Sequence, residues 1–151
     1  MWKWMIGSAV SVILAIAAWF ATNYLGRPLL KFIDLRSEAH ETIFRYANIL
    51  SERPASLAHA EDGRAQLRQL GAKIDALRVV LPPPIGWCLS ICRYDLRTAA
   101  EGLTGLSNSL GTHDSDTVWF RVQAQRALRL PIDPNEQKRV EVRKRLDGVP
   151  F

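Results

Sequence analysis

The side chains with the most potential for chemistry are two cysteines, three histidines and a group of arginines near the C-terminus. Cys88 and Cys92 are four residues apart, a spacing that places both thiols on one face of a helix, where they could form half of a metal site. The chain has only 2 cysteines, so any further thiolate ligand would come from another copy. We therefore expect both cysteines to be small, buried apolar groups.

The histidines, His40, His59 and His113, fall into no metal-binding or catalytic motif. His40 precedes Glu41 but lacks the second histidine of H-E-x-x-H. Residues 103–110 are rich in small polar side chains, which could line a ligand pocket or end a helix. Catalysis needs a convergent set of acid, base, nucleophile or metal, and the sequence suggests none. We predict no metal, no cofactor and no enzymatic activity.

Positive charge is concentrated at the C-terminal end. Residues 27–118 carry 11 basic and 11 acidic side chains, whereas residues 119–151 carry 8 basic and 4 acidic ones, a balance of +4. Three interpretations remain open: a solvated face attracted to anionic lipid, a site for an anion or nucleotide, or a nucleic-acid surface on which Trp119 and Phe120 stack. The candidate residues for binding lipid or an anionic ligand are Arg121, Arg126, Arg129, Arg139 and Arg143.

Helices must position these side chains, because the sequence indicates an all-α fold. Of 151 residues, 48% are apolar and 23% charged, which excludes a disordered chain. No segment shows the alternation of a strand. After the apolar N-terminal segment we expect five helices. They cover residues 29–50, 61–81, 87–110, 117–130 and 134–146.

Prolines and glycines predict where these helices end and how they pack. Pro28, just after Gly26, is expected to break or kink the chain where the second helix begins. Residues 82–84 are three prolines and should form a stiff, extended connector. Gly102 and Gly105 should allow close helix packing or a local kink. A short heptad seam, typical of a bundle contact, is formed by Leu67, Leu70, Ile74, Leu77 and Leu81.

The N-terminal apolar segment has the length of a membrane span. Residues 4–25 carry no charge and would form a helix about 33 Å long, against a hydrocarbon core of about 30 Å. A cleaved signal peptide is the alternative, but the apolar segment continues past the possible A-x-A site. We predict a transmembrane helix in residues 1–26 and a helical cytosolic domain in residues 27–151, with basic C-terminal helices in residues 119–151.

The flanking charges predict the orientation of the span. Only Lys3 precedes it, whereas Arg27, Lys31 and Arg36 follow it closely. The positive-inside rule therefore places the N-terminus outside and the helical domain in the cytoplasm, a reducing compartment.

One side of the span carries small residues at spacings of three and four. A stripe of this kind lets helices approach closely in lipid, so we predict a homo-oligomer, which could enclose a narrow pore lined by Ser11 and Thr22. Ordinary alanine-rich membrane sequence is the alternative. The stripe consists of Gly7, Ser11, Ala15, Ala18 and Thr22.

Short patterns along the first two thirds of the chain resemble a group of small bacterial single-span membrane proteins. They are Gly26-Arg27-Pro28, Phe32 with Leu35-Arg36, Tyr46-Ala47-Asn48 and Gly105-Leu106-Ser107-Asn108. The architecture is similar to that of membrane effectors of antiphage defence systems of the Hailong type, in which a span joins a cytosolic helical domain and oligomers form a regulated ion channel. The resemblance implies a location in the bacterial inner membrane.

Two functions are compatible with these features. The first is a pore-forming effector that self-associates through its span and is gated by an anionic ligand, such as a nucleotide or oligonucleotide, or by a cognate cytosolic protein. The alternative is a monomeric anchor or scaffold that recruits a cytosolic partner through the apolar face of residues 29–50.

Overall fold

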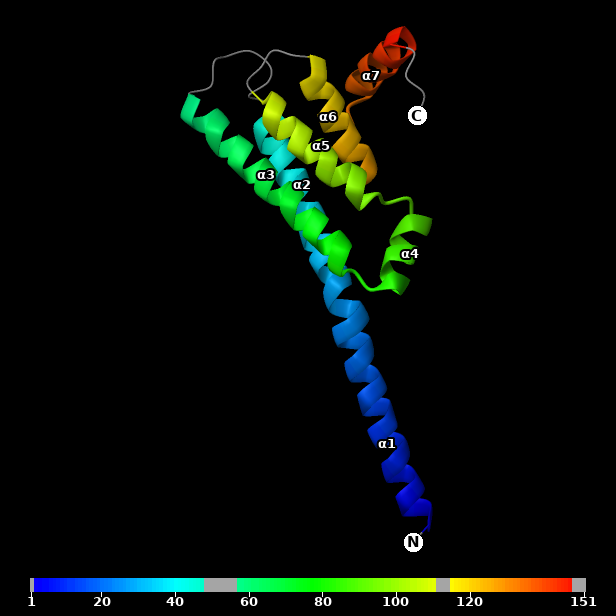
Figure 1. Cartoon of the computed structure of the whole chain (residues 1–151). Coiled ribbons are helices and arrows are strands. Elements are labelled where there is room, and N and C mark those ends of the chain that lie inside the picture. The colour runs from blue at the N-terminus through cyan, green and yellow to red at the C-terminus, as the bar shows by residue number, and fades with distance from the viewer. Residues whose placement is uncertain (1, 48–56, 111–114, 148–151) are drawn as a thin grey trace.

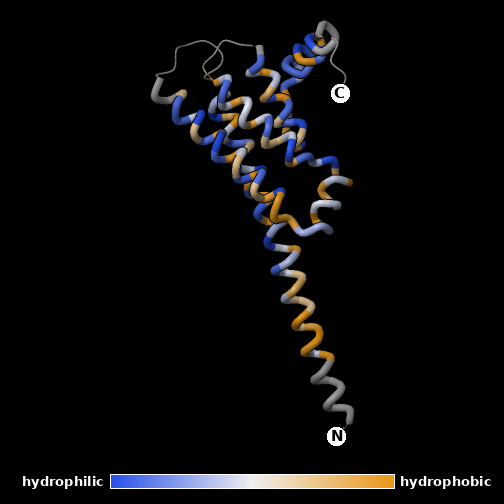
Figure 2. Tube along the Cα trace, in the orientation of Figure 1, coloured by the Kyte–Doolittle hydropathy of each residue, from blue (hydrophilic) through white to orange (hydrophobic). Residues whose placement is uncertain are grey.

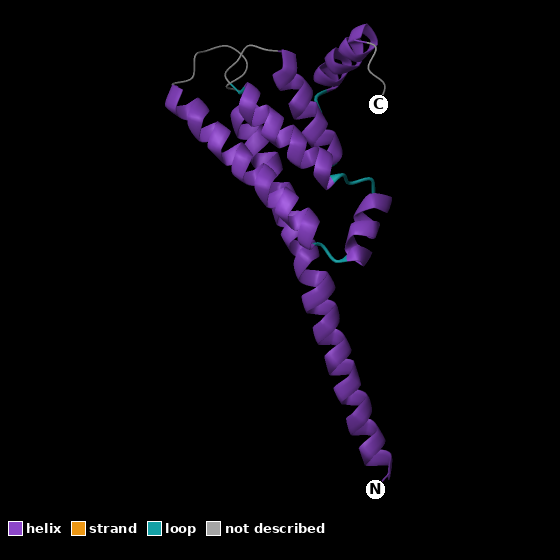
Figure 3. Ribbon diagram, viewed as in Figure 1, coloured by secondary structure: helices purple, strands orange, loops and turns teal. Residues whose placement is uncertain are grey.

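The fold is all-α, as predicted. The computed structural model describes residues 2–47, 57–110 and 115–147, and it describes side chains in 10–46, 60–110 and 116–143. The structure is 89% helix, and no strand occurs in the described ranges (Figure 3). The elements are α1 (Trp2–Phe20), the π-helical turn η1 (Ala21–Gly26), α2 (Arg27–Ala47), α3 (Leu57–Val80), α4 (Pro83–Ile91), α5 (Leu96–Ser109), α6 (Ser115–Ala127) and α7 (Pro134–Asp147).

The first three elements follow one another without a break and form one long helical rod (Figure 1). Its N-terminal part extends away from the other helices, and Figure 2 shows its apolar character. Val10–Tyr46 is long and apolar enough to cross a membrane, and 0% of its apolar window is buried inside the structure. The side chains from Val10 to Ala21 are all exposed.

Of the break or kink expected at Pro28, the break does not occur, because a wider turn accommodates the proline and the helix continues through it. Pro28 cannot donate a backbone hydrogen bond, and in a regular α-helix its ring would collide with the carbonyl four residues earlier. In η1 the Arg27 N–H donates instead to the Thr22 carbonyl, five residues back. The Asn23 side chain adds a 2.8 Å hydrogen bond to the Trp19 carbonyl. One π-helical turn thus replaces the predicted break.

The remaining helices pack as a bundle on α2. Helix α2 contacts α3, α3 contacts α5, α5 contacts α6, and α6 contacts α7. The predicted heptad seam on α3 is confirmed, since its first four members are buried and Leu81 packs against the core. The buried face of α2 consists of Phe32, Leu35, Ala39, Ile43 and Tyr46.

Glycines allow α5 to approach its neighbours closely, as predicted. A Cβ added at Gly102 would lie 2.9 Å from the backbone nitrogen of Ala124 in α6 and 3.1 Å from its Cα. On the other side of α5, a Cβ at Gly71 of α3 would lie 2.9 Å from the Thr104 hydroxyl. Backbone atoms of a packed helix cannot move aside as a flexible side chain can, so the contact at Gly102 tolerates no larger residue.

The predicted extended proline connector is wrong for two of its three residues. Pro82 is extended, with ψ of 139°, and precedes α4, while Pro83 and Pro84 form the first turn of that helix. The first turn has no intrahelical partners for its N–H groups, so proline loses nothing there.

The predicted helix 87–110 is also wrong, because it is two helices, α4 and α5, separated by a tight turn. Arg93 has φ of 59°, and the Arg93 and Tyr94 N–H groups donate back to Ser90 and Leu89, each at 2.9 Å. This is a Schellman motif, which ends a helix. The described residues after η1 therefore contain six helices and not five.

We predict opposite effects of alanine at two helical glycines. Gly102→Ala should destabilise the bundle by about 1–3 kcal/mol, because the new methyl group overlaps the Ala124 backbone. Gly86→Ala in α4 should be neutral or stabilising by up to about 1 kcal/mol, since the nearest atom to its Cβ lies 4.0 Å away. Thermal unfolding of the full-length protein in mild detergent, followed by circular dichroism, measures both changes. Equal effects of the two substitutions would contradict the close packing at Gly102.

Candidate functional site

The predicted small-residue stripe lies on the free part of the rod. Ser11, Ala15 and Ala18 are exposed on α1, and Thr22 is exposed at the beginning of η1. The surroundings of Gly7 lie outside what the structure describes. Since the spacing in α1 is α-helical, the stripe keeps to one side of the rod up to the π-helical turn.

Three of the five C-terminal arginines hold helices together. Arg121 of α6 is buried and forms an ion pair with Glu136 of α7, and Arg143 pairs with Asp116 at 2.7 Å. Burial lowers the pKa of the Arg121 guanidinium, while the negative charge of Asp133 acts in the opposite direction. The Arg121 Nε has no hydrogen-bond partner, so this group is held in place mainly by one carboxylate.

Arg129 has a structural contact of its own. Its guanidinium donates to the Cys92 carbonyl at 3.1 Å, and its backbone adopts φ of 51° at the end of α6. Arg36 of α2 donates to the Leu128 and Arg129 carbonyls, each at 2.9 Å. At the same end of α6, the Asp95 N–H donates to the Ala127 carbonyl at 3.1 Å. Helices α2, α4 and α6 therefore meet at one hydrogen-bonded junction.

Of the five predicted anionic-ligand residues, Arg126, Arg129 and Arg139 are exposed. Arg121, Arg129 and Arg143 hold contacts within the protein.

The cysteines differ from the expectation, whereas residues 103–110 end helix α5, which is one of the two roles predicted for them. Cys88 and Cys92 are both exposed, so the expectation that they are buried is wrong. Ser107 and Ser109 are buried and donate to carbonyls of their own helix, at 2.7 Å and 3.1 Å, so these hydroxyls satisfy the helix and do not line a pocket. His40 is exposed, whereas His59 and His113 have side chains outside the described residues.

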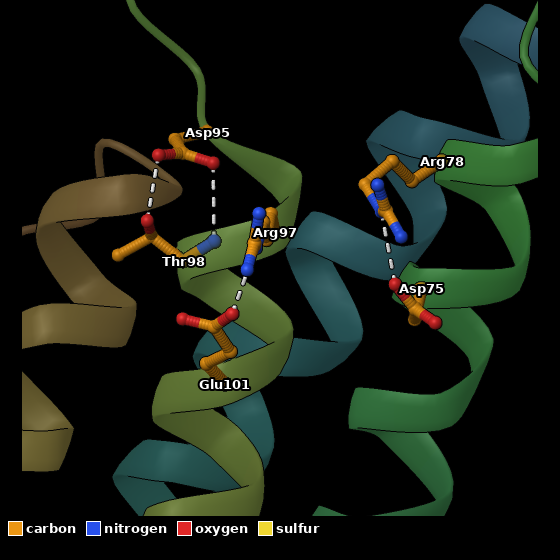
Figure 4. A network of polar contacts seen from close by, with 6 residues as sticks. All are labelled: Asp75, Arg78, Asp95, Arg97, Thr98 and Glu101. Carbon is orange, nitrogen blue, oxygen red and sulfur yellow. Dashed lines mark hydrogen bonds and ion pairs between the residues drawn. The ribbon is translucent and has the colours of Figure 1, made fainter.

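A groove that the sequence did not reveal lies between α3 and α5. Its volume is about 860 Å³, and it is lined by both charged and small residues. Arg78 pairs with Asp75 on the α3 side at 2.9 Å, and Arg97 pairs with Glu101 on the α5 side at 2.9 Å (Figure 4). A second groove of about 470 Å³ shares both arginines and adds Arg93 and Asp95.

These grooves have the chemistry of a weak anion site. The arginines at the two grooves are exposed, and the two guanidinium groups in Figure 4 are each balanced by a carboxylate on the same helix. An oxyanion could replace those carboxylates, because planar guanidinium groups bind phosphate and carboxylate in the same bidentate geometry. No group of three or more histidine, cysteine or acidic side chains that could hold a metal ion occurs in the part of the chain whose side chains are described.

Sequence reasoning missed these arginines because their surroundings are electrically balanced. The net charge of residues 27–118 is zero, so no basic segment marks Arg78, Arg93 or Arg97. The available signal was the spacing of opposite charges, such as Arg97 with Glu101 four residues later, which predicts a solvent-exposed helix face.

Comparison with known proteins found no match to the chain among protein-family models, curated proteins or solved structures.

The buried ion pair yields a testable prediction about stability. Glu136→Ala leaves the buried Arg121 guanidinium without its carboxylate, which should cost about 2–4 kcal/mol. Arg143→Gln breaks the more exposed pair with Asp116 and should cost at most about 1 kcal/mol. Chemical unfolding of the full-length protein in detergent compares the two variants. A larger loss from Arg143→Gln would refute the assignment of Arg121 as the main link between α6 and α7.

A second prediction concerns pH and the beginning of α5. Burial raises the pKa of the Asp95 carboxyl, but hydrogen bonds from the Thr98 hydroxyl at 2.6 Å and the Thr98 N–H at 3.0 Å outweigh it and lower the pKa overall. A lowered pKa stabilises the fold above the unfolded-state value of about 3.9, and this stabilisation disappears as the pH falls through the folded-state value.

Asp95→Asn keeps a good helix cap but cannot titrate. The unfolding midpoint of the unmodified protein should therefore fall relative to that of Asp95→Asn between about pH 5 and pH 3. Parallel curves for the two proteins over that range would contradict the role of the Asp95 carboxylate.

Proposed function

We propose that this chain is a single-span membrane protein that self-associates through its transmembrane helix. The observation that carries the proposal is the uninterrupted rod, whose apolar N-terminal part is covered by none of the other described helices. Exposed side chains such as Val12, Ile13 and Trp19 would be unfavourable in water, whereas a bilayer would bury them.

Self-association follows from the small-residue side of that rod. In lipid, helices associate where small side chains let their backbones approach, and Ser11, Ala15 and Ala18 offer such a side. Ile13 and Phe20 lie on the opposite side by helical spacing. The flanking charges orient the span with its N-terminus outside and the bundle in the cytoplasm, in a bacterial inner membrane.

The output that we propose is a gated ion pore, as in the antiphage effectors that the architecture resembles. Binding of an anionic ligand or of a cognate protein to the bundle would change how neighbouring bundles pack. Because α2 belongs both to the bundle core and to the rod, a movement of the bundle would also move the span. No flexible linker separates the two parts of this helix in the described residues.

One observation weighs against the alternative of a monomeric anchor. In that alternative the apolar face of residues 29–50 docks the partner. Phe32, Leu35 and Ile43 on that face are buried in the bundle and are not available to another protein, although Leu29, Leu30, Ile33 and Phe44 remain exposed.

The test compares the same substitution on two sides of the span. Ala15→Leu adds bulk to the small-residue stripe, whereas Ala17→Leu adds it about 160° away from position 15 around the helix. We expect the unmodified protein and Ala17→Leu to form a defined oligomer of three or more chains in mild detergent. Ala15→Leu should reduce the molar mass.

Native mass spectrometry or light scattering gives the number of chains per particle. A monomeric unmodified protein would contradict the proposal and favour the anchor. An oligomer that Ala15→Leu leaves intact would show that the stripe is not the contact.

A further inference from the structure

A second apolar segment, separate from the span, forms the corner between α3 and α4. Residues 79–92 carry no Asp, Glu, Lys or Arg. An uncharged segment of about 10–14 residues is too short to cross a bilayer and is typical of a buried core helix or of a segment at the membrane interface. The chain bends by 117° between α3 and α4 at this corner. We call residues 79–91 the α3–α4 corner.

Much of the corner is not buried in the core. Ile85 and Leu89 attach α4 to the bundle, but Val79, Val80 and Ile91 are exposed, and Trp87 is 69% exposed. By helical spacing, Trp87 lies opposite the buried pair on α4. The corner therefore fits an interfacial segment better than a core helix.

The packing of α3 on α2 fixes the level of the corner along the rod. Tyr46 donates to Asp62 at 2.8 Å, and Lys73 pairs with Glu38 at 2.7 Å. These pairs define an antiparallel register, in which Val80 lies level with about residue 31 of α2. That level is about 9 Å beyond Leu25, the last residue of the uncharged span, at 1.5 Å per residue.

This level coincides with the edge of a bilayer that the span would occupy. The headgroup regions add about 5–8 Å on each side of the hydrocarbon core. In Figure 1 the Pro83 end of α4 lies on the side of the bundle from which α1 extends. Leu29, Leu30 and Ile33 of α2 are also exposed near that level. Figure 2 shows apolar residues along both segments.

Charge around the corner suits the same environment. Lys31, Arg78 and Arg93 lie next to it in the sequence or in the antiparallel register, and all three side chains are exposed or half-buried. Basic side chains at this depth attract anionic lipid headgroups, and tryptophan concentrates at the membrane interface. Asp75 balances Arg78 in part.

We propose that the α3–α4 corner binds the interfacial layer of the bilayer, so that the bundle rests on the membrane at two points, the span and the corner. This proposal rests on the proposed membrane span. Through the Arg129 contact to Cys92 and the Asp95 contact to Ala127, the corner is connected to the end of α6. The membrane would thus hold α4 directly, and it would hold α6 through the hydrogen bonds between α6 and the end of α4.

The test places an environment-sensitive fluorophore at single cysteines. In a full-length Cys88→Ser, Cys92→Ser background, a nitrobenzoxadiazole label is attached at Trp87→Cys, Leu14→Cys or Phe44→Cys. Phe44 is the matched control, because this aromatic side chain is 71% exposed but lies near the other end of α2. The proteins are reconstituted in vesicles of phosphatidylcholine and phosphatidylglycerol, with or without spin-labelled lipid.

We expect the labels at positions 14 and 87 to emit at shorter wavelength and to lose fluorescence with spin-labelled lipid, while the label at 44 does neither. Quenching at 14 but not at 87 would overturn the corner proposal and leave the span intact. No quenching at 14 would overturn the span itself, and the corner proposal with it.

Two further outcomes also count against the corner. A shorter emission wavelength at 87 without quenching would mean that a second copy or another protein covers it. Equal quenching at 87 and 44 would mean that the bundle lies on the membrane without a preferred side. If Trp87→Cys does not fold, Ile91→Cys replaces it, because Ile91 is exposed on the same helix.

Discussion

The bundle depends on how closely α5 approaches the helices on either side of it. At Gly102 the backbone of α6 occupies the space that any side chain would need, and at Gly71 a threonine of α5 fills the corresponding space on α3. These contacts bring the three helices together so that Leu67, Leu103 and Leu128 lose contact with solvent. The groove between α3 and α5 lies at the edge of this contact, because Gly71 and Ala100 also line it.

Hydrogen bonds at helix ends stabilise the bundle in addition to its apolar packing. The last carbonyls of a helix have no hydrogen-bond donors within that helix. At the end of α6, Arg36 donates to the Leu128 and Arg129 carbonyls, and the Asp95 N–H donates to the Ala127 carbonyl. Arg129 does the same for α4 at Cys92. A charge-assisted hydrogen bond to an otherwise unsatisfied carbonyl contributes more than an exposed ion pair. Some arginines, such as Arg36 and Arg121, therefore close helix ends or cross between helices, whereas others, such as Arg78 and Arg97, face the grooves.

Sequence reasoning predicted the features that depend on local periodicity. The leucine seam of α3 and the packing role of Gly102 follow from spacing alone, and both are confirmed. Sequence reasoning failed where contacts with other parts of the chain determine the local conformation. Pro28 remains helical because a single wide turn satisfies it, and α4 separates from α5 because Arg93 adopts a conformation that no sequence pattern marks. The buried position of Arg121 could not be predicted either, since it depends on α7 folding back to bring Glu136 to it.

The π-helical turn has a consequence for symmetry. Each residue of an α-helix rotates the chain by about 100°, and the wider π-helical turn changes this rotation over its own length. The turn therefore sets a fixed angle between the small-residue side of the span and the α3-facing side of α2. In a ring of identical chains, the arrangement of the bundles around the symmetry axis would then decide which side of every span faces that axis. One residue added or removed in this turn would rotate all the spans together, without altering a single contact inside the bundle.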